Sequence, residues 1–325
     1  MNSRQRFLAS LLGRALDHPP LFPEGLRPEV IRRWRKQGLP PGKHPADLFY
    51  YDDFEELLPD VYPSPALADW SDKKKALQLL GERLDPADPR RLPRGWKRSL
   101  RRWLERDYPL LLRIHPGLFL SLGVEEWGRF AEVALLLADD PGFVAEVLAV
   151  QAAFSARLAE LILRQVDVDA VVFSEPIAGN HGPLISPRMF RELVLPSLAP
   201  IFEVLERFQV PVLIWRSYAD PGLLVREVAA SQINAGACTA LWLCETPPGR
   251  LAYPALRREL GPEIALIGGI DADVLYQTPA EIRQAVETVQ PLLPQGRFIP
   301  LADGRVRPDV PYANYAFYRR PFGSK

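Results

Sequence analysis

The sequence has little cysteine, no surplus of charge and no long apolar run, and each shortage excludes a class of protein. Two cysteines in 325 residues are too few for a disulfide framework, which fits a reducing cytoplasm. Forty basic residues balance forty acidic ones, so no overall field draws the chain to nucleic acid or to anionic lipid. No run approaches the ~18 apolar residues of a membrane helix, and residues 1–14 carry three arginines but no small-residue cleavage site. We therefore expect a cytoplasmic protein with no signal peptide, no membrane segment and no nucleic-acid partner.

The chain has an ordinary globular share of apolar residues, 47%, and an unusually large number of prolines, 34. The first third is irregular, and from about residue 109 onward short apolar runs alternate with amphipathic segments of helical period. The runs, which we interpret as buried strands, lie at 110–114, 170–173, 210–215, 240–244, 264–267 and 298–300. The helical segments lie at 143–165, 187–207, 222–230 and 280–292.

Strands that alternate with helices pair in parallel through right-handed crossovers, and near-continuous apolar strands indicate a sheet buried on both faces. An open doubly wound sheet and a closed (βα)8 barrel both satisfy this pattern. The open sheet most often carries a GxGxxG turn after an early strand, and this sequence has none. We therefore predict an α/β protein with one domain over residues 1–325. It is a single (βα)8 TIM barrel with an irregular N-terminal extension that covers the cleft.

In such a barrel the active site lies where the strands end, so the residues after each run are the candidates. These positions carry ionisable or phenolic side chains, at Glu175, His181, Arg216, Tyr218, Glu245, Asp271, Asp303 and Arg305. Arginine holds a carboxylate through two parallel hydrogen bonds, and crowded carboxylates push one another toward protonation. The residue types therefore predict a small anionic substrate and a carboxylic acid that donates a proton.

Several of these residues belong to motifs of a known family. Residues 172–190 read VFSEPIAGNHGPLISPRMF and resemble the uroporphyrinogen decarboxylase superfamily, where a polar strand end and an Ala-Gly turn precede a helix that starts with Ser-Pro. Residues 266–275, LIGGIDADVL, look like its Gly-Gly-Ile-Asp strand end, and residues 298–315 look like its closing strand and tail. Residues 4–8 and 17–20 fit its N-terminal helix. The ordered set implies a single (βα)8 barrel with a deep cleft at the carboxyl ends of the strands.

The resemblance implies one of two chemistries. The decarboxylases remove acetate carboxylates from a porphyrinogen without metal or cofactor; an aspartate near the N-terminus binds the pyrrole N–H groups, and arginines of an RQAGRY-like loop hold the carboxylates. The other branch moves methyl groups between corrinoid proteins and small thiols or methoxy compounds. Several of its members hold zinc through a His-x-Cys after a middle strand and a cysteine in the last loop.

The zinc pattern is absent from this sequence. Arg216-Ser217-Tyr218 stands where the resemblance places His-x-Cys, and Leu301-Ala302-Asp303 stands where it places the late cysteine. Zinc needs thiolate or imidazole ligands, and an arginine repels the ion. Cys238 and Cys244 are interpreted as small buried core residues. We predict no metal and no cofactor.

The decarboxylase pattern is incomplete. The loop at residues 23–29 lacks the RQAGRY motif and keeps one arginine, Arg27, and the family's aspartate corresponds to Asp52 or Asp53. The last-loop histidine of the decarboxylases aligns with Asp303. These departures indicate a divergent paralogue, and an inactive ligand-binding protein on the same scaffold stays open.

The predicted site follows from the strand ends and from the resemblance together. Glu175, His181 and Asp303 are the predicted catalytic residues. The predicted substrate-binding residues are Arg27, Asp52, Arg216, Tyr218, Glu245, Asp271 and Arg305. The expected activity is a cofactor-free carboxy-lyase acting on a carboxylated, tetrapyrrole-like or smaller substrate, with a corrinoid-dependent methyltransferase as the alternative. The eight basic residues in 90–106 are interpreted as a solvated helix, a subunit surface of a homodimer, or a face toward a corrinoid protein.

Overall fold

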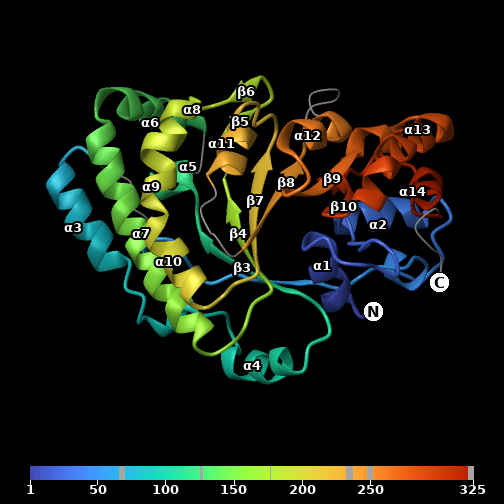
Figure 1. Ribbon diagram of the computed structural model, residues 1–325, viewed down its shortest axis with the longest axis horizontal. Helices are drawn as coiled ribbons and strands as arrows, with labels where there is room; N and C mark the ends of the chain where they lie inside the picture. The colour runs from blue at the N-terminus through green and yellow to red at the C-terminus, as the bar shows by residue number, and fades with distance from the viewer. Residues whose placement is uncertain (66–69, 125–126, 176, 232–236, 247–251, 321–325) are drawn as a thin grey trace.

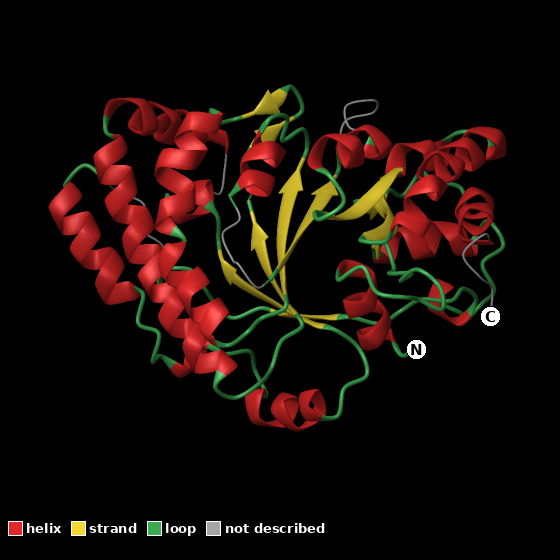
Figure 2. Cartoon of the chain, viewed as in Figure 1, coloured by secondary structure: helices red, strands yellow, loops and turns green. Residues whose placement is uncertain are grey.

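The structure, a computed structural model, describes residues 1–65, 70–124, 127–175, 177–231, 237–246 and 252–320. Its centre is a curled sheet of seven parallel strands in the order β10-β9-β8-β7-β4-β3-β2. These strands are β2 (Glu55–Leu57), β3 (Leu110–His115), β4 (Ala170–Ser174), β7 (Val212–Tyr218), β8 (Cys238–Cys244), β9 (Ala265–Asp271) and β10 (Phe298–Asp303). Each of the six apolar runs is thus a strand, and Figure 2 shows the strands fanning out from their amino ends.

Helices follow most strands and lie against the outside of the sheet, as Figure 1 shows. The N-terminal third contains α1 (Ser3–Leu11), α2 (Pro28–Arg35), α3 (Lys73–Arg83) and α4 (Trp96–Leu104). The middle contains α5 (Leu118–Ser121), α6 (Trp127–Asp139), α7 (Pro141–Leu163), α8 (Pro187–Met189), α9 (Leu195–Ser197) and α10 (Ala199–Arg207). The last part contains α11 (Leu224–Ala230), α12 (Tyr253–Leu260), α13 (Pro279–Val289) and α14 (Tyr312–Arg319). Among the described helices none is both long and apolar enough to cross a bilayer.

Local sequence signals explain where two of these helices begin. Ser186 accepts a hydrogen bond from the Met189 amide and precedes a proline at the first position of α8. At α13, Thr278 accepts from the Glu281 amide while Glu281 accepts from the Thr278 amide, which is a capping box. Ser186 comes after β6 (Gly182–Pro183) and Thr278 comes after β9, so each signal marks where the chain turns from the carboxyl end of the sheet into a helix.

The ring of strands differs from the expected eight. The described residues contain seven strands in the sheet, and β2 and β10 are its edges. Residues 21–26 run between these edges. The Asp52 amide, just before β2, donates to the Leu21 carbonyl, and β1 (Gly25–Leu26) pairs in parallel with β11 (Arg305–Val306), just after β10. An extended segment too irregular to count as a strand of the sheet therefore occupies the expected eighth place.

The N-terminal third is less irregular than the sequence suggested, because it supplies the edge strand β2 and the helix α1. Phe7 and Leu11 of α1 pack into the apolar cluster inside the curled sheet. The Arg4 amide donates to the Asp107 carbonyl, before β3, and the Ser10 hydroxyl donates to the Phe298 carbonyl at the start of β10. Helix α1 thus lies at the amino ends of the strands. That the extension covers the cleft at the opposite end stays a prediction.

Candidate active site

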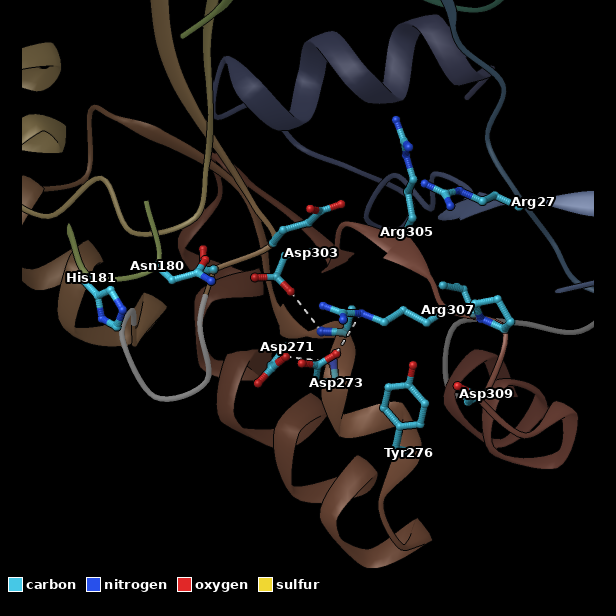
Figure 3. A pocket seen from close by; sticks show the side chains of 15 residues that line it. Arg27, Asn180, His181, Asp271, Asp273, Tyr276, Asp303, Arg305, Arg307 and Asp309 are labelled. Atoms are coloured by element: carbon cyan, nitrogen blue, oxygen red, sulfur yellow. Dashed lines mark hydrogen bonds and ion pairs between the residues drawn. The ribbon is translucent and has the colours of Figure 1, made fainter. Parts of the chain in front are cut away.

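A cavity of about 790 Å³ opens at the carboxyl ends of β8, β9 and β10. A volume of this size suits a small-molecule site. Its lining includes nine acidic or basic side chains: Arg27, His181, Glu245, Asp271, Asp273, Asp303, Arg305, Arg307 and Asp309. In Figure 3 Arg27 and Arg305 lie on one side of the cavity, the aspartates 271, 273 and 303 lie on another, and the Arg307 side chain reaches between them.

The alternation of side chains along each strand explains why some strand-end residues face the inside of the ring. Val212 and Ile214 of β7 belong to the inner apolar cluster, so Arg216 and Tyr218 continue the inner row. On β9 and β10 the inner rows are Ala265 and Ile267, and Ile299 and Leu301. Counting on by twos brings Asp271 and Asp303 to the inside, and these two aspartates are direct partners in the register of the two strands.

Asp303 is the most deeply placed carboxyl group of the cavity, with 6% of the residue exposed. It accepts a hydrogen bond from the Ala272 amide at 2.9 Å, which favours the ionised form. Burial outweighs this contact, and together with the negative charges of Asp271 and Asp273 it raises the pKa of Asp303 to about 7. At neutral pH a large share of Asp303 is therefore a neutral carboxylic acid that can donate a proton.

The neighbouring carboxylates form a short chain of contacts that ends on a cation. Asp271 accepts from the Asp273 amide at 2.8 Å, and burial raises the pKa of Asp271. Arg307 pairs with Asp273 at 3.3 Å. Arg307 is the cation nearest to this group of aspartates in the lining, and it partly offsets their mutual repulsion.

Two loops complete the rim. The short hairpin of β5 (Ala178–Gly179) and β6 (Gly182–Pro183) carries the exposed His181 into the lining. Glu245 follows β8 with a positive φ of 51°. Gly304 packs so closely against it that a Cβ on Gly304 would lie 2.7 Å from the Glu245 Cγ. The structure thus brings seven of the predicted site residues into or onto the mouth of the ring, namely Arg27, His181, Glu245, Asp271, Asp303 and Arg305 in the cavity and Tyr218 in the inner row.

Glu175 lies on the other face of the sheet. Ala170 and Val172 face inward, so the alternation turns Glu175 outward, where it is 2% exposed beside the fully buried His115. It accepts from the Leu118 amide at 3.1 Å, and burial raises its pKa to about 7, while burial lowers the pKa of His115 to about 3. Glu175 does not line the cavity at β8, β9 and β10, so its expected contact with substrate finds no support in this geometry.

Asp52 is likewise remote from the cavity. It is fully buried and forms an ion pair with Arg6 of α1. It also accepts hydrogen bonds from the Ser3 hydroxyl at 3.0 Å and from the Leu21 amide at 2.9 Å. These contacts satisfy its oxygens within the protein, so Asp52 ties the N-terminal segments together instead of binding a ligand.

Arg216 is buried inside the ring, below the cavity, and pairs with Glu56, a residue that no sequence motif singled out. Its Nη1 donates to Glu56 Oε1 of β2 at 2.5 Å. Burial acts to lower the pKa of Arg216, and the hydrogen bond and charge of Glu56 more than offset it, so the pKa is raised. The guanidinium carbon lies 4.9 Å from the centre of the Trp242 ring. Burial raises the pKa of the adjacent Tyr218.

The residues present do not fit the zinc site of the methyltransferase branch. No group of three or more His, Cys, Asp or Glu side chains in the described ranges is arranged to hold a metal. Arg216 stands where the sequence resemblance places the ligand histidine, and burial raises the pKa of the Cys244 thiol to about 12. A thiolate ligand is therefore disfavoured at neutral pH. That the purified protein carries no zinc stays a prediction.

Sequence reasoning missed Asp273, Asp309 and Tyr276 as lining residues, and Glu56 as the partner of Arg216. The sequence could have indicated Asp273 as a lining residue, because it lies two residues after Asp271 at a predicted strand end. Glu56 carried none, since it is 160 residues from Arg216 in the sequence.

The curled parallel sheet and the ionisable cavity at the carboxyl ends of its strands define an α/β protein of the TIM-barrel type. The model of the uroporphyrinogen decarboxylase (URO-D) family matches residues 128–317, more than half of the chain. The chain belongs to this family.

Two individual proteins are similar to the chain. A uroporphyrinogen decarboxylase of Hydrogenovibrio crunogenus is 27% identical over 173 residues, which cover 51% of this chain and 44% of that protein. The matched part thus spans less than half of the relative. A methyltransferase from Methanosarcina mazei has a structure that superposes with a TM-score of 0.54 over 99% of both chains, at 14% identity. This second likeness concerns the fold.

Proposed function

We propose that the protein is a carboxy-lyase that acts without a metal or cofactor on a carboxylated, tetrapyrrole-like or smaller substrate. The observation that supports the proposal is the placement of Asp303. A carboxylic acid with a pKa of about 7 is buried at the floor of a cavity whose opposite side carries arginines. Family membership supports the same reaction class.

The proposed reaction uses Asp303 as the proton donor. Arg27 and Arg305 hold carboxylates that the substrate keeps, because guanidinium groups bind carboxylates bidentately. As CO₂ leaves, the carbon–carbon bond breaks and its electron pair stays on the substrate carbon. The proton of Asp303 then forms the new C–H bond, and the aspartate regains a proton from water. A general acid whose pKa lies near the working pH is best suited to this step.

The balance of charge in the cavity narrows the substrate class. Its lining carries three arginines but five carboxyl groups. A ligand that offers only carboxylates would meet repulsion from Asp271, Asp273 and Glu245. A ligand that offers N–H donors as well as carboxylates satisfies both sides of the cavity. Pyrrole acetates and their oligomers have this chemistry.

The test is turnover under exclusion of oxygen. Uroporphyrinogen and a monopyrrole acetate are incubated with the protein, and released CO₂ and the masses of the products are measured. We expect loss of carboxyl groups from at least one of the two, and a fall of roughly 10²–10⁴-fold in the rate for Asp303→Asn, the range of a lost general acid. Absence of CO₂ release from both compounds with folded protein would contradict the proposal.

One observation favours a second candidate, methyl transfer from a methoxy compound to a corrinoid protein. The excess of carboxyl groups over arginines suits an uncharged substrate, and the neutral acid Asp303 can protonate the oxygen from which the methyl group departs. The basic helix α4 precedes the amino end of β3, at the end of the sheet opposite to the cavity, so its position does not support docking of a corrinoid protein at the cavity (Figure 1). Formation of methylcobalamin and a free phenol from cob(I)alamin and an uncharged methoxybenzene, without CO₂ release, would favour this candidate.

A further inference from the structure

Three buried N–H groups inside the ring of strands have no acceptor among the described residues. They are Nε and Nη2 of Arg216 and Nε1 of Trp242. Only 7% of Arg216 and 9% of Trp242 are exposed. Buried donors are nearly always hydrogen-bonded in folded proteins, so these three groups indicate an acceptor that the described residues do not supply.

The geometry holds these donors together at one level. Arg216 and Trp242 are direct partners in the register of β7 and β8, and the guanidinium lies over the indole ring. Glu56 accepts from Nη1 and so fixes the guanidinium. The remaining Nε and Nη2 form the edge of the guanidinium that can bind both oxygens of a carboxylate.

The charges at this level favour an anion. Arg113 continues the inner row of β3 two residues after Leu111, and its charge acts on Tyr218. Of the described side chains of the inner rows at this level, Arg113 and Arg216 are positive and Glu56 is negative, which leaves one positive charge in excess. The further negative charges of Asp303 and Glu245 act on Cys244, two residues beyond Trp242 on β8. Because burial raises the pKa of Tyr218, that phenol adds no negative charge at neutral pH.

We propose that Arg216 and Trp242 form a carboxylate-binding recess below the cavity and that it takes a second carboxylate of the substrate. This inference rests on the proposed function for the identity of its occupant. The register of the strands pairs Arg216 of β7 with Trp242 of β8, and the pairing continues across β9 to Ile299 of β10. Asp303 lies four residues beyond Ile299 along β10. Four residues of a parallel strand span about 13 Å. The substrate class is therefore a polycarboxylate that reaches from the proton donor to the recess.

Acetate is the probe for the recess, because it is a small carboxylate and needs no turnover. The indole N–H signals of ¹⁵N-labelled protein are followed by NMR while acetate is added, with chloride at equal ionic strength as the control. The Trp242 signal is assigned from its loss in Trp242→Phe. We expect acetate to shift this signal and chloride to leave it in place. The signals of Trp34 and Trp103, whose indoles donate to Val310 and Glu55, should not move.

Two substitutions sharpen the test. Arg216→Lys keeps a positive charge near Glu56 but removes Nε and Nη2, so the acetate response of Trp242 should disappear. Glu56→Gln removes the competing negative charge, so half-saturation should need roughly threefold to tenfold less acetate. Unchanged Trp34 and Trp103 signals show that each variant is folded, and if either variant unfolds, the acetate and chloride titrations of the unmodified protein decide the outcome.

The proposal is overturned if acetate leaves the Trp242 signal in place, if chloride shifts it equally, or if folded Arg216→Lys retains the response. These outcomes are separate from those of the proposed function. If acetate shifts the Trp242 signal but no CO₂ is released, the proposed lyase activity is contradicted and the proposed recess is supported. If CO₂ is released but acetate does not shift the Trp242 signal, only the proposed recess is contradicted.

Discussion

At the scale of single residues, two carboxylic acids have the same raised pKa but lie in different places. Burial raises the pKa of both Glu175 and Asp303 to about 7. Glu175 faces the helices behind the sheet, and Asp303 faces the cavity. A raised pKa therefore identifies a candidate acid only when the side chain also reaches the place where a ligand can bind.

The ion pair between Arg307 and Asp273 should tune the acid. Arg307→Gln leaves the negative charge of Asp273 unopposed near Asp303, so the pKa of Asp303 should rise further. Asp273→Asn is the matched variant and should lower that pKa. We expect opposite displacements of roughly half a pH unit each in the alkaline limb of the rate profile. Displacements of the same sign would exclude a charge effect of Asp273 on Asp303.

Glu175 should make the stability of the fold depend on pH. Its folded-state pKa of about 7 lies above the ordinary value of 4.5, so its contribution is complete below pH 4.5 and is lost as the pH rises through 7. Glu175→Gln should remove this loss. The difference in free energy of unfolding between the variant and the original protein should therefore increase by on the order of 3 kcal/mol, in favour of the variant, from pH 4.5 to pH 8.

Urea denaturation at both pH values measures this difference. Glu263→Gln, at a side chain that is 81% exposed, reports what the same chemical change does on the surface. A Glu175→Gln variant whose stability follows the unmodified protein at both pH values would show that Glu175 is not buried as described.

At the scale of elements, the sequence predicts six of the seven strands of the sheet and misses β2, and it ends β7, β9 and β10 three to four residues too early. It predicts the faces of the strands when alternation is applied. Asp271 and Asp303 lie where counting by twos from the inner apolar residues places them. The same count along β4 turns Glu175 away from the ring, so its placement could have been predicted. The pairs of Arg216 with Glu56 and of Asp52 with Arg6 could not, because each joins elements that are distant in sequence and whose neighbours only the whole fold decides.

The turn after β10 should be sensitive to a single methyl group. Gly304 has a φ of 111°, a conformation that residues with a Cβ rarely adopt, and a Cβ would clash with Glu245. We expect Gly304→Ala to lower the free energy of unfolding by about 1–3 kcal/mol. Gly81 of α3 is the control: a Cβ added there would have no neighbour within 4 Å, so Gly81→Ala should stabilise by about 0.5–1 kcal/mol. Thermal melts of both variants measure the contrast, and a neutral Gly304→Ala would contradict the close contact.

At the scale of the whole molecule, the N-terminal segments are tied to the ring by buried polar contacts. Arg6 and Asp52 connect α1 with the chain before β2, and Leu21 joins the same group through its amide. Helix α1 also places Phe7 and Leu11 inside the ring. Because these contacts lie at the amino ends of the strands, their role is stability, and the carboxyl ends are left to the cavity.

Asp52→Asn should therefore separate stability from binding. Asp52→Asn leaves Arg6 with Asp17 as its remaining counter-ion and weakens the buried hydrogen bonds of Asp52, so we expect a loss of about 1–3 kcal/mol in the free energy of unfolding. The KM for a substrate found by the turnover assay should stay within about twofold, since Asp52 does not line the cavity. A large rise in KM at unchanged stability would restore Asp52 as a binding residue.

The proposed chemistry depends most on Asp303 being a neutral acid in the cavity near neutral pH. ¹³C NMR of protein labelled at the aspartate Cγ measures its ionisation directly and requires no substrate. The Asp303 signal is assigned by its absence in Asp303→Asn, and its chemical shift is followed from pH 4 to pH 9. We expect a midpoint at about 7. A midpoint below pH 5 would show that Asp303 is ionised at neutral pH and would contradict its role as proton donor.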